Sequence, residues 1–344
     1  MQLRPERQVF CMYFVNIYHR SKMSQMNKNP DQNINEIMDL IDSINIIDTN
    51  EDNTTTVPAT ASAALDWLHR ATGKAPLSLN AERLAIFSAN YGFTGNFPSS
   101  APSLEYVNNF ISDSNKNTLK LNRLCEHANS DLRLYELTPS ASTPDTIKSD
   151  ATSQTSEEMV RAMAYGMLAV EHDIDLFSAS TFGAGSDAAA LAIILAHLPA
   201  SQTFDGLDII TASLFKKNQG EKGLSCLMNI GGPEISALCG AILSTRLAGL
   251  PMFLDGLGSY AALLVLSHHC SHIGQHCALT GKIPLDIIPD EKLVTFLPAP
   301  YEYISELENY EATGISSMCL IPQLKNEILI SAPDKNLKKR LESY

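Results

Sequence analysis

Apolar residues in this chain occur as short continuous runs that end at glycine-containing turns. The clearest run, 174–179, predicts a buried strand because it is short and almost uninterrupted. The turn Gly183–Asp187 (GAGSD) follows it, and an Ala/Leu/Ile-rich stretch up to His197 then predicts a helix. We therefore expect a strand, a glycine turn and a helix in succession.

A glycine turn before a helix is a layout that can bind an anion. Glycines let the backbone approach a ligand closely, and the free N–H groups of the first helical turn, at the positive end of the helix dipole, can hold a phosphate. A tight strand-to-helix turn without a ligand is the alternative, because a lone glycine motif has low specificity. Asp187 favours that alternative, since two unit charges about 4 Å apart repel by roughly 4 kcal/mol at an effective dielectric constant near 20.

The same alternation of elements extends over most of the chain. Helices are predicted at 34–47, 61–71, 103–115, 117–128, 159–170, 233–243 and 259–266, and strands at 84–89, 131–137 and 250–254. A capping box of Thr155 and Glu158 opens one of these helices, and Pro233 suits the first turn of another. Strands that alternate with helices predict an α/β fold with a mainly parallel, Rossmann-like sheet flanked by helices.

Polar residues and glycines follow each of the long predicted strands. In a parallel α/β sheet, ligands bind in the crevice at the carboxyl ends of the strands. We therefore expect these groups to converge on one site: Asn90, Thr181–Asp187, Gly231 with Gly232, and Asp255 with Gly256.

The composition narrows the classes of function. The chain has 344 residues, 44% of them hydrophobic, and a formal net charge of -13. This content is ordinary for a globular protein, and the negative charge argues against a nucleic-acid or membrane partner. The seven cysteines show no CxxC pairing, which is typical of a reducing compartment and predicts a cytoplasmic location. No apolar run reaches the roughly 18 residues of a membrane span.

Four motifs occur in an order that is more specific than any of them alone. A GGPEI element (Gly231–Ile235) precedes a predicted helix, and a PMFLDG element (Pro251–Gly256) ends a predicted strand. An SH element (Ser267, His268) and an EATG element (Glu311–Gly314) follow. With these motifs the chain resembles, from about residue 84 to residue 323, the nicotinate-nucleotide:dimethylbenzimidazole phosphoribosyltransferase family, which makes the lower-ligand nucleotide of cobalamin.

The resemblance implies a domain organisation. A phosphoribosyltransferase-like domain would span 59–344, with a large α/β part at about 80–300 and a small helical part from about 59–80 and 300–344. The family pattern also implies a homodimer. Residues 1–58 include a stretch rich in Asn, Asp, Ser and Thr and one amphipathic piece, so we expect a variable, partly disordered segment with one helix.

The reaction that the resemblance implies is transfer of the phosphoribosyl group of nicotinate mononucleotide to a benzimidazole base, giving α-ribazole 5′-phosphate and nicotinate. No pyrophosphate has to be neutralised, so the resemblance implies small-molecule substrates without a cofactor or a metal. Glu311 would be the catalytic base. The implied nucleotide and phosphate residues are Thr181, Gly183, Gly185, Ser186, Lys216, Gly231, Gly232, Asp255, Gly256 and Ser267, and the implied base-binding residues are Asn90, Pro98, Tyr106 and Phe182.

The chain departs from the family pattern at its glycine turn. The family has G-E-M-G-I-G-N-T; here both later glycines persist, but Thr181 replaces the acidic residue and Asp187 stands where a neutral Thr would receive phosphate. The family's D-H-G strand end is Asn90-Tyr91-Gly92. These changes favour a second hypothesis, a catalytically degenerate homologue that binds a nucleotide or a benzimidazole-like ligand or partners an active homologue. Glu311 favours an active enzyme.

Other kinds of site are weaker interpretations. His268, His272 and His276 recur every four residues, so a helix would place them on one face as a zinc or iron surface. Gly274 interrupts that face, and His268 is expected instead to line the nucleotide site or to cap a helix. The order Gly-Ala-Gly-Ser at 183–186 is wrong for a hydrolase nucleophile turn, and a dinucleotide-binding fingerprint would need a third glycine.

Overall fold

Six parallel strands form one sheet in the order β2-β1-β3-β4-β5-β6. The computed structural model describes residues 30–45, 61–72, 79–96, 102–138, 142–171, 173–198, 207–280, 302–303 and 314–331. The strands are β1 (Glu82–Ser88), β2 (Ser130–Glu136), β3 (Leu176–Phe182), β4 (Met252–Asp255), β5 (Cys277–Leu279) and β6 (Glu302–Tyr303). The predicted parallel α/β architecture is confirmed.

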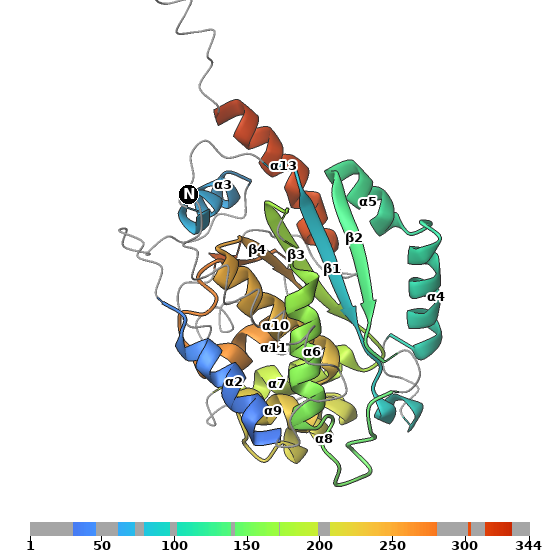
Figure 1. Ribbon diagram of the computed structural model, residues 1–344. Helices are drawn as coiled ribbons and strands as arrows, with labels where there is room; N and C mark the ends of the chain where they lie inside the picture. The colour runs from blue at the N-terminus through green and yellow to red at the C-terminus, as the bar shows by residue number, and fades with distance from the viewer. Residues whose placement is uncertain are drawn as a thin grey trace, which may run out of the picture.

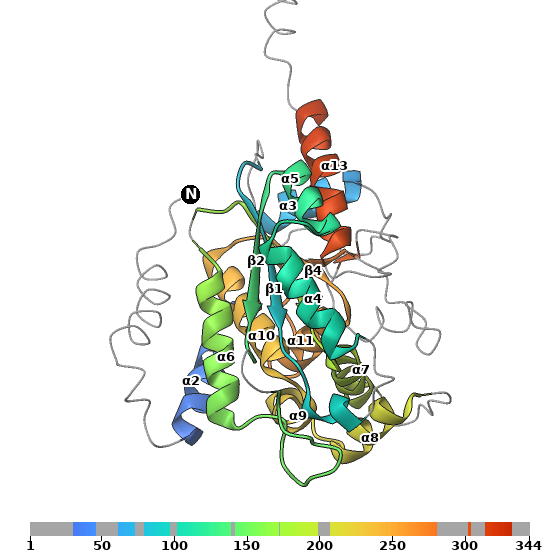
Figure 2. The same cartoon turned by 90° about the vertical axis from the view of Figure 1, so that its right-hand side faces the viewer.

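Helices cover both faces of this sheet (Figure 1), and Figure 2 shows the strands between α2 and α6 on one side and α4, α5 and α13 on the other. The first face carries α2 (Pro30–Asp42), α6 (Ser156–Ala169), α7 (Ser186–His197), α8 (Ile209–Lys217), α9 (Gly223–Ile230), α10 (Pro233–Ala248) and α11 (Leu257–Ser267). The second carries α3 (Ala61–Thr72), α4 (Leu104–Asn115), α5 (Lys120–Ala128) and α13 (Ile315–Ser331).

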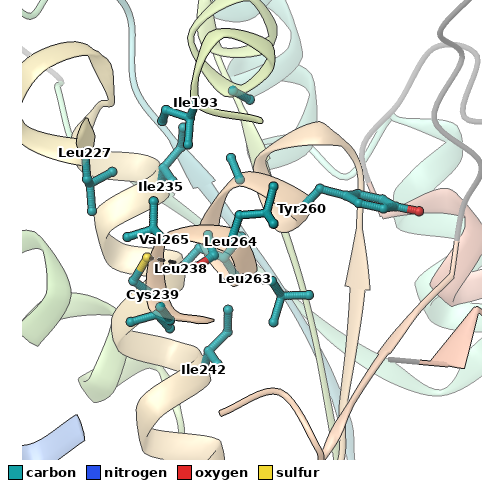
Figure 3. Close-up of a cluster of buried hydrophobic side chains, with 14 of the residues drawn as sticks. Ile193, Leu227, Ile235, Leu238, Cys239, Ile242, Tyr260, Leu263, Leu264 and Val265 are labelled. Atoms are coloured by element: carbon teal, nitrogen blue, oxygen red, sulfur yellow. Dashed lines mark hydrogen bonds between the residues drawn. The ribbon is translucent and has the colours of Figure 1, made fainter. Parts of the chain in front are cut away.

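The central strands send alternate side chains into two separate cores. On β1, Ala85 and Phe87 belong to the core beneath α6 and α10, whereas Leu84 and Ile86 belong to the core beneath α3 and α13. Every residue of β1 and β3 is buried, as expected for parallel strands covered on both faces. Figure 3 shows part of the first core, where buried side chains of α7, α9, α10 and α11 lie together.

The helix α2 lies outside the phosphoribosyltransferase-like domain expected from sequence but packs into its core. Its residues Ile37, Leu40 and Ile41 are buried in the first core. Just after the helix, the carbonyl oxygen of Ile44 lies 2.9 Å from His272 Nε2. The predicted helix in the N-terminal segment is therefore confirmed, while 1–29 and 46–60 lie outside the described residues.

Some predicted elements differ from the structure. The strand predicted at 174–179 runs from Leu176 to Phe182, because its pairing with β1 continues through the polar residues up to the glycine turn. The helices α8 and α9 and the strands β5 and β6 were not predicted. These elements are short, so periodicity gives only a weak signal for them.

The three histidines at four-residue spacing do not share a helical face, because α11 ends at Ser267 and turns follow. His276 forms a 2.8 Å hydrogen bond with Thr245 Oγ1, whereas His272 contacts Ile44. Among the described residues, no three His, Cys, Asp or Glu side chains are arranged to hold a metal ion. In the same part of the chain, no helix is both long and apolar enough to cross a membrane.

Candidate functional site

The end of β1 and the glycine turn after β3 are joined by three hydrogen bonds. The Ala89 N–H donates to the Phe182 carbonyl oxygen at 3.1 Å, and the Tyr91 N–H donates to the Ala184 carbonyl oxygen at 3.0 Å. The Ala184 N–H donates to Asn90 Oδ1, also at 3.0 Å. Asn90, predicted to bind the base, thus has its side-chain oxygen engaged in fixing the turn.

Glu234 connects this turn to the start of α10. Its Oε1 accepts hydrogen bonds from the Tyr91 hydroxyl at 2.8 Å and from Ser186 Oγ at 2.9 Å. The side chain is fully buried, and burial raises the pKa of Glu234 to about 7. Burial, with Glu234 beside it, also raises the pKa of Tyr91 well above its usual value. A carboxyl that titrates near neutral pH therefore lies beside the glycine turn.

Asp187 in the first turn of α7 is exposed to solvent. Enough protein nevertheless surrounds its carboxyl that desolvation raises the pKa of Asp187 to about 6. Because this pKa lies below 7, the Asp187 carboxyl keeps most of its negative charge at pH 7. Its charge is therefore available to repel an anion at this helix end.

The end of β4 adds a third strand to the same edge. Ser180 Oγ donates to the carbonyl oxygen of Asp255 at 2.8 Å. Asp255 is fully buried, and its Oδ2 accepts a 3.1 Å hydrogen bond from the Ser316 N–H in the first turn of α13. Thr181 lies against the start of α11, where a Cβ on Gly258 would be 2.0 Å from Thr181 Oγ1. The buried Asp255 thus links the sheet to the C-terminal helix.

Phe182 lies on the opposite face of β3 from Thr181, because neighbouring strand residues alternate. Its ring packs against Phe110 of α4 at a centroid distance of 4.4 Å and against Tyr106 at 6.2 Å. Tyr106 is 47% exposed. The two predicted base-binding residues Tyr106 and Phe182 therefore form one aromatic surface with Phe110.

Gly185, Gly231 and Gly232 lie at the ends of helices that begin or finish at this edge. Gly185 is the N-cap of α7 with a φ of 86°, which favours glycine, and Gly232 is the N-cap of α10. Gly231 is the C-cap of α9, and a Cβ on it would lie 2.5 Å from Leu227. Gly256 begins α11 at a φ of 82°. All four glycines thus shape the backbone around the predicted site.

One predicted residue, Ser267, lies apart from this group. Ser267 is the last residue of α11, so about 15 Å of helix separates it from Gly256. Lys216 is exposed in the last turn of α8, and its neighbour Lys217 donates to the Ser149 carbonyl oxygen at 2.6 Å. Helices that follow parallel strands run back toward the opposite edge, which explains the position of Ser267. Pro98 and Glu311 lie outside the described residues.

Known proteins resemble this chain in both sequence and fold. A family model described as "Phosphoribosyltransferase" matches residues 61–283. The nicotinate-nucleotide–dimethylbenzimidazole phosphoribosyltransferase of Sinorhizobium sp. is 27% identical over 232 residues, which cover 62% of this chain and 66% of that protein. The enzyme of the same name from Cereibacter sphaeroides is 27% identical over 244 residues, covering 63% and 71%.

The chain belongs to the nicotinate-nucleotide:dimethylbenzimidazole phosphoribosyltransferase family. The match thus spans just under two thirds of the length of the Sinorhizobium relative. Two solved structures share the fold. CobT from Thermus thermophilus has a TM-score of 0.62 and 17% identity, covering 87% of this chain and 96% of that one. A second structure, of the phosphoribosyltransferase from the same organism, has a TM-score of 0.65.

The sequence motifs of this phosphoribosyltransferase family member assigned no role to Glu234 or Tyr91. A signal was present, because Glu234 is the single acidic residue in α10, a helix that is otherwise apolar or small up to Arg246. A charged residue in a helix buried all round requires a polar partner. Tyr91 is this partner, and it occupies the position of the histidine in the family's D-H-G strand end.

Proposed function

We propose that this chain transfers the phosphoribosyl group of nicotinate mononucleotide to a benzimidazole-type base and releases nicotinate. The main support is the convergence of Gly183, Ser186, Glu234 and Asp255 at the carboxyl ends of β1, β3 and β4 in a chain of this family. This edge of a parallel sheet is where α/β proteins bind ligands. The proposal includes a cytoplasmic homodimer that makes α-ribazole 5′-phosphate for cobalamin synthesis.

The proposed phosphate position is the N-terminus of α7. The Ser186 N–H at the start of this helix donates to the Gly183 carbonyl oxygen, so the proposal relies on the other backbone N–H groups of the first turn and on the positive end of the helix dipole. The Ser186 hydroxyl belongs to the same turn, where the side chains of Phe93 and Thr94 pack against Gly185. A phosphate would therefore approach from the Ser186 side of the turn. Thr181 and Gly232 border this position in the proposal, and Lys216 would supply a cation from α8.

The proposed base slot lies on the α4 face of β3. Tyr106 and Phe182 offer an aromatic edge and face, which suit a flat heterocycle such as a benzimidazole. Tyr106 is the more exposed of the two, so it can contact a ligand without rearrangement of the core. Pro98 belongs to this proposed slot on the family pattern alone.

The proposed general base is Glu311, which would accept the benzimidazole N–H proton as the ribosyl bond forms. Support comes from the segment that follows it in the sequence. Gly314 packs against Leu84 of β1, and the Ser316 N–H donates to Asp255 at the end of β4. The EATG motif therefore leads directly into residues that contact the body of β1 and the end of β4.

The second candidate function is nucleotide or base binding without turnover. Thr181 and Asp187 favour it, because the family's acidic residue is absent and a negative charge lies in the first turn of α7. Under this alternative the chain would retain the binding surfaces and bind a nucleotide or benzimidazole-like ligand without turnover, or partner an active homologue.

The test is release of nicotinate by purified protein given nicotinate mononucleotide and dimethylbenzimidazole. We expect release by the wild-type chain and none by Glu311→Gln, which has the same shape but cannot accept a proton. The matched control is Glu105→Gln in α4, which should release nicotinate at the wild-type rate. Wild-type release no faster than that of Glu311→Gln, together with calorimetric binding of the nucleotide, would establish the binding alternative.

A further inference from the structure

The hydrogen-bond pattern around Glu234 is unbalanced between its two oxygens. Oε1 accepts from both Tyr91 and Ser186, whereas Oε2 is buried without a hydrogen-bond partner among the described residues. Oε2 lies beside Gly232, where a Cβ would be 2.3 Å from it. Leaving a buried carboxylate oxygen unpaired is costly. The geometry therefore disfavours a permanent charge on Glu234.

The charge on Glu234 also fixes the direction of the Ser186 hydroxyl. A carboxylate is only an acceptor, so the single hydroxyl hydrogen of Ser186 must point at Oε1. In that state the Ser186 oxygen presents only lone pairs to its other neighbours. A protonated Glu234 can instead donate from Oε1 to Ser186 Oγ, and the Ser186 hydrogen then becomes free to donate elsewhere.

We propose that Glu234 takes up one proton when an anion binds at the glycine turn, because this proton releases the Ser186 hydroxyl to donate to the anion. The proton moves from solvent to Oε1, the Ser186–Glu234 hydrogen bond reverses, and no covalent bond of substrate is involved. Glu234 is thus a positioning residue that acts through Ser186. The inference rests on the proposed nucleotide site and adds that proton concentration regulates nucleotide binding there.

The pKa of Glu234, raised to about 7 by burial, makes this exchange accessible near neutral pH. Tyr91 faces Glu234 from the end of β1 and stays protonated, because its own pKa is raised. Asp187 follows Ser186 on α7 and is the other carboxyl at this turn. On α6, Glu158 and Arg161 line, together with Pro233, a pocket of about 320 Å³.

These α6 charges already have partners. Glu158 accepts from Thr155 in the capping box, and Arg161 forms a 3.0 Å ion pair with Glu157. Besides Glu234, the carboxyls at this edge of the sheet are Asp187 in the turn and the buried Asp255 at the end of β4. The experiment must therefore separate Glu234 from both, and Glu234→Gln does so directly.

The experiment is calorimetric titration with nicotinate mononucleotide between pH 7.5 and 8.5, repeated in buffers of different ionisation enthalpy to count protons. The phosphate of the nucleotide is already a dianion in this range, since its second pKa is about 6. Uptake of one proton predicts that wild-type affinity falls about tenfold over this unit of pH. The Glu158→Gln control, outside the site, should behave as wild type.

The informative variant is Glu234→Gln. With its amide nitrogen in the place of Oε1, this variant donates to the hydroxyl oxygens of both Ser186 and Tyr91 at every pH. It should therefore bind without proton uptake and with pH-independent affinity, at least as tightly as wild type at pH 8.5. Asp187→Asn should retain the uptake of one proton that belongs to Glu234, while any further uptake in the wild type that this variant loses belongs to Asp187. In Tyr91→Phe, loss of a donor to Oε1 should move the midpoint of the pH dependence upward, which gives a second test if Glu234→Gln fails to fold.

The outcomes separate this inference from the proposed function. Equal proton uptake by wild type and Glu234→Gln would overturn the role of Glu234 while leaving the nucleotide site intact. Uptake that disappears in Asp187→Asn would assign the proton to Asp187 and would also overturn it. No binding of the nucleotide by wild type at any pH would overturn the proposed site and the inference together.

Discussion

Gly183 lies so close to Ala89 that a Cβ atom on the glycine would be 1.6 Å from the alanine carbonyl oxygen. The contact joins the turn after β3 to the end of β1, where Ala89 and Phe182 also share a backbone hydrogen bond. A backbone oxygen cannot rotate away as a side chain can. Glycine is therefore required at 183 by the approach of two strand ends, whether or not a ligand binds.

Gly183→Ala should destabilise the protein and displace the glycine turn. Overpacking of a well-packed interior typically costs about 1–3 kcal/mol, and here the clash is with backbone, so we expect the upper end of that range. Urea unfolding measures the change. Gly95→Ala is the matched control, because a Cβ there meets nothing within 4 Å. Equal stability of the two variants would show that the strand ends can separate.

Asp187→Thr should tighten nucleotide binding at pH 8 by tenfold or more. The substitution removes a charge whose repulsion of a phosphate could reach roughly 4 kcal/mol at 4 Å. Because the pKa of Asp187 is raised to about 6, the wild-type carboxyl is mostly neutral at pH 5. The ratio of variant to wild-type affinity should therefore shrink toward one as the pH falls through 6.

Calorimetry with nicotinate mononucleotide at pH 8 and pH 5 measures this ratio, and division by the wild-type value at each pH cancels the titration of the phosphate itself. An affinity that is unchanged at both pH values would mean that the Asp187 carboxyl points away from the phosphate. A ratio that stays constant across pH would assign the effect to the shape of Thr rather than to charge.

The parallel α/β class and the convergence of strand ends could be predicted from sequence, because buried strands and glycine turns leave strong local signals. The ends of β1, β3 and β4, which carry Asn90, the glycine turn and Asp255, lie side by side in the sheet. What could not be predicted depends on contacts between distant segments. Glu234 and Tyr91 are 143 residues apart, and the position of Ser267 depends on the length of α11 rather than on its motif.

Tyr106→Ala should weaken binding of the benzimidazole-type base while leaving the protein stable. Aromatic contacts contribute about 0.5–1.5 kcal/mol beyond buried area, so the dissociation constant should rise roughly two- to tenfold. Tyr106 is 47% exposed, and Tyr165 on α6, at 41%, is the matched control on the other face of the sheet. An equal loss of base affinity in both variants would argue against a slot at α4, as would no loss in either.

Acid should destabilise the fold partly through His276, which is buried beside Thr245. Burial, together with the charge of Arg246, lowers the pKa of His276 from 6.5 to about 3. Between these values the unfolded chain binds the proton and the folded chain does not. The stability that this group contributes is therefore complete above pH 6.5 and is lost as the pH falls toward 3.

His276→Gln keeps a polar group beside Thr245 but cannot titrate. Relative to this variant, the wild type should lose about 2 kcal/mol of unfolding free energy between pH 6.5 and 4.5, at up to 1.36 kcal/mol per pH unit, as measured by urea unfolding. His127→Gln, at an exposed position of α5, should follow the wild-type curve. Parallel curves for wild type and His276→Gln would show that the pKa of His276 is the same in the folded and the unfolded protein.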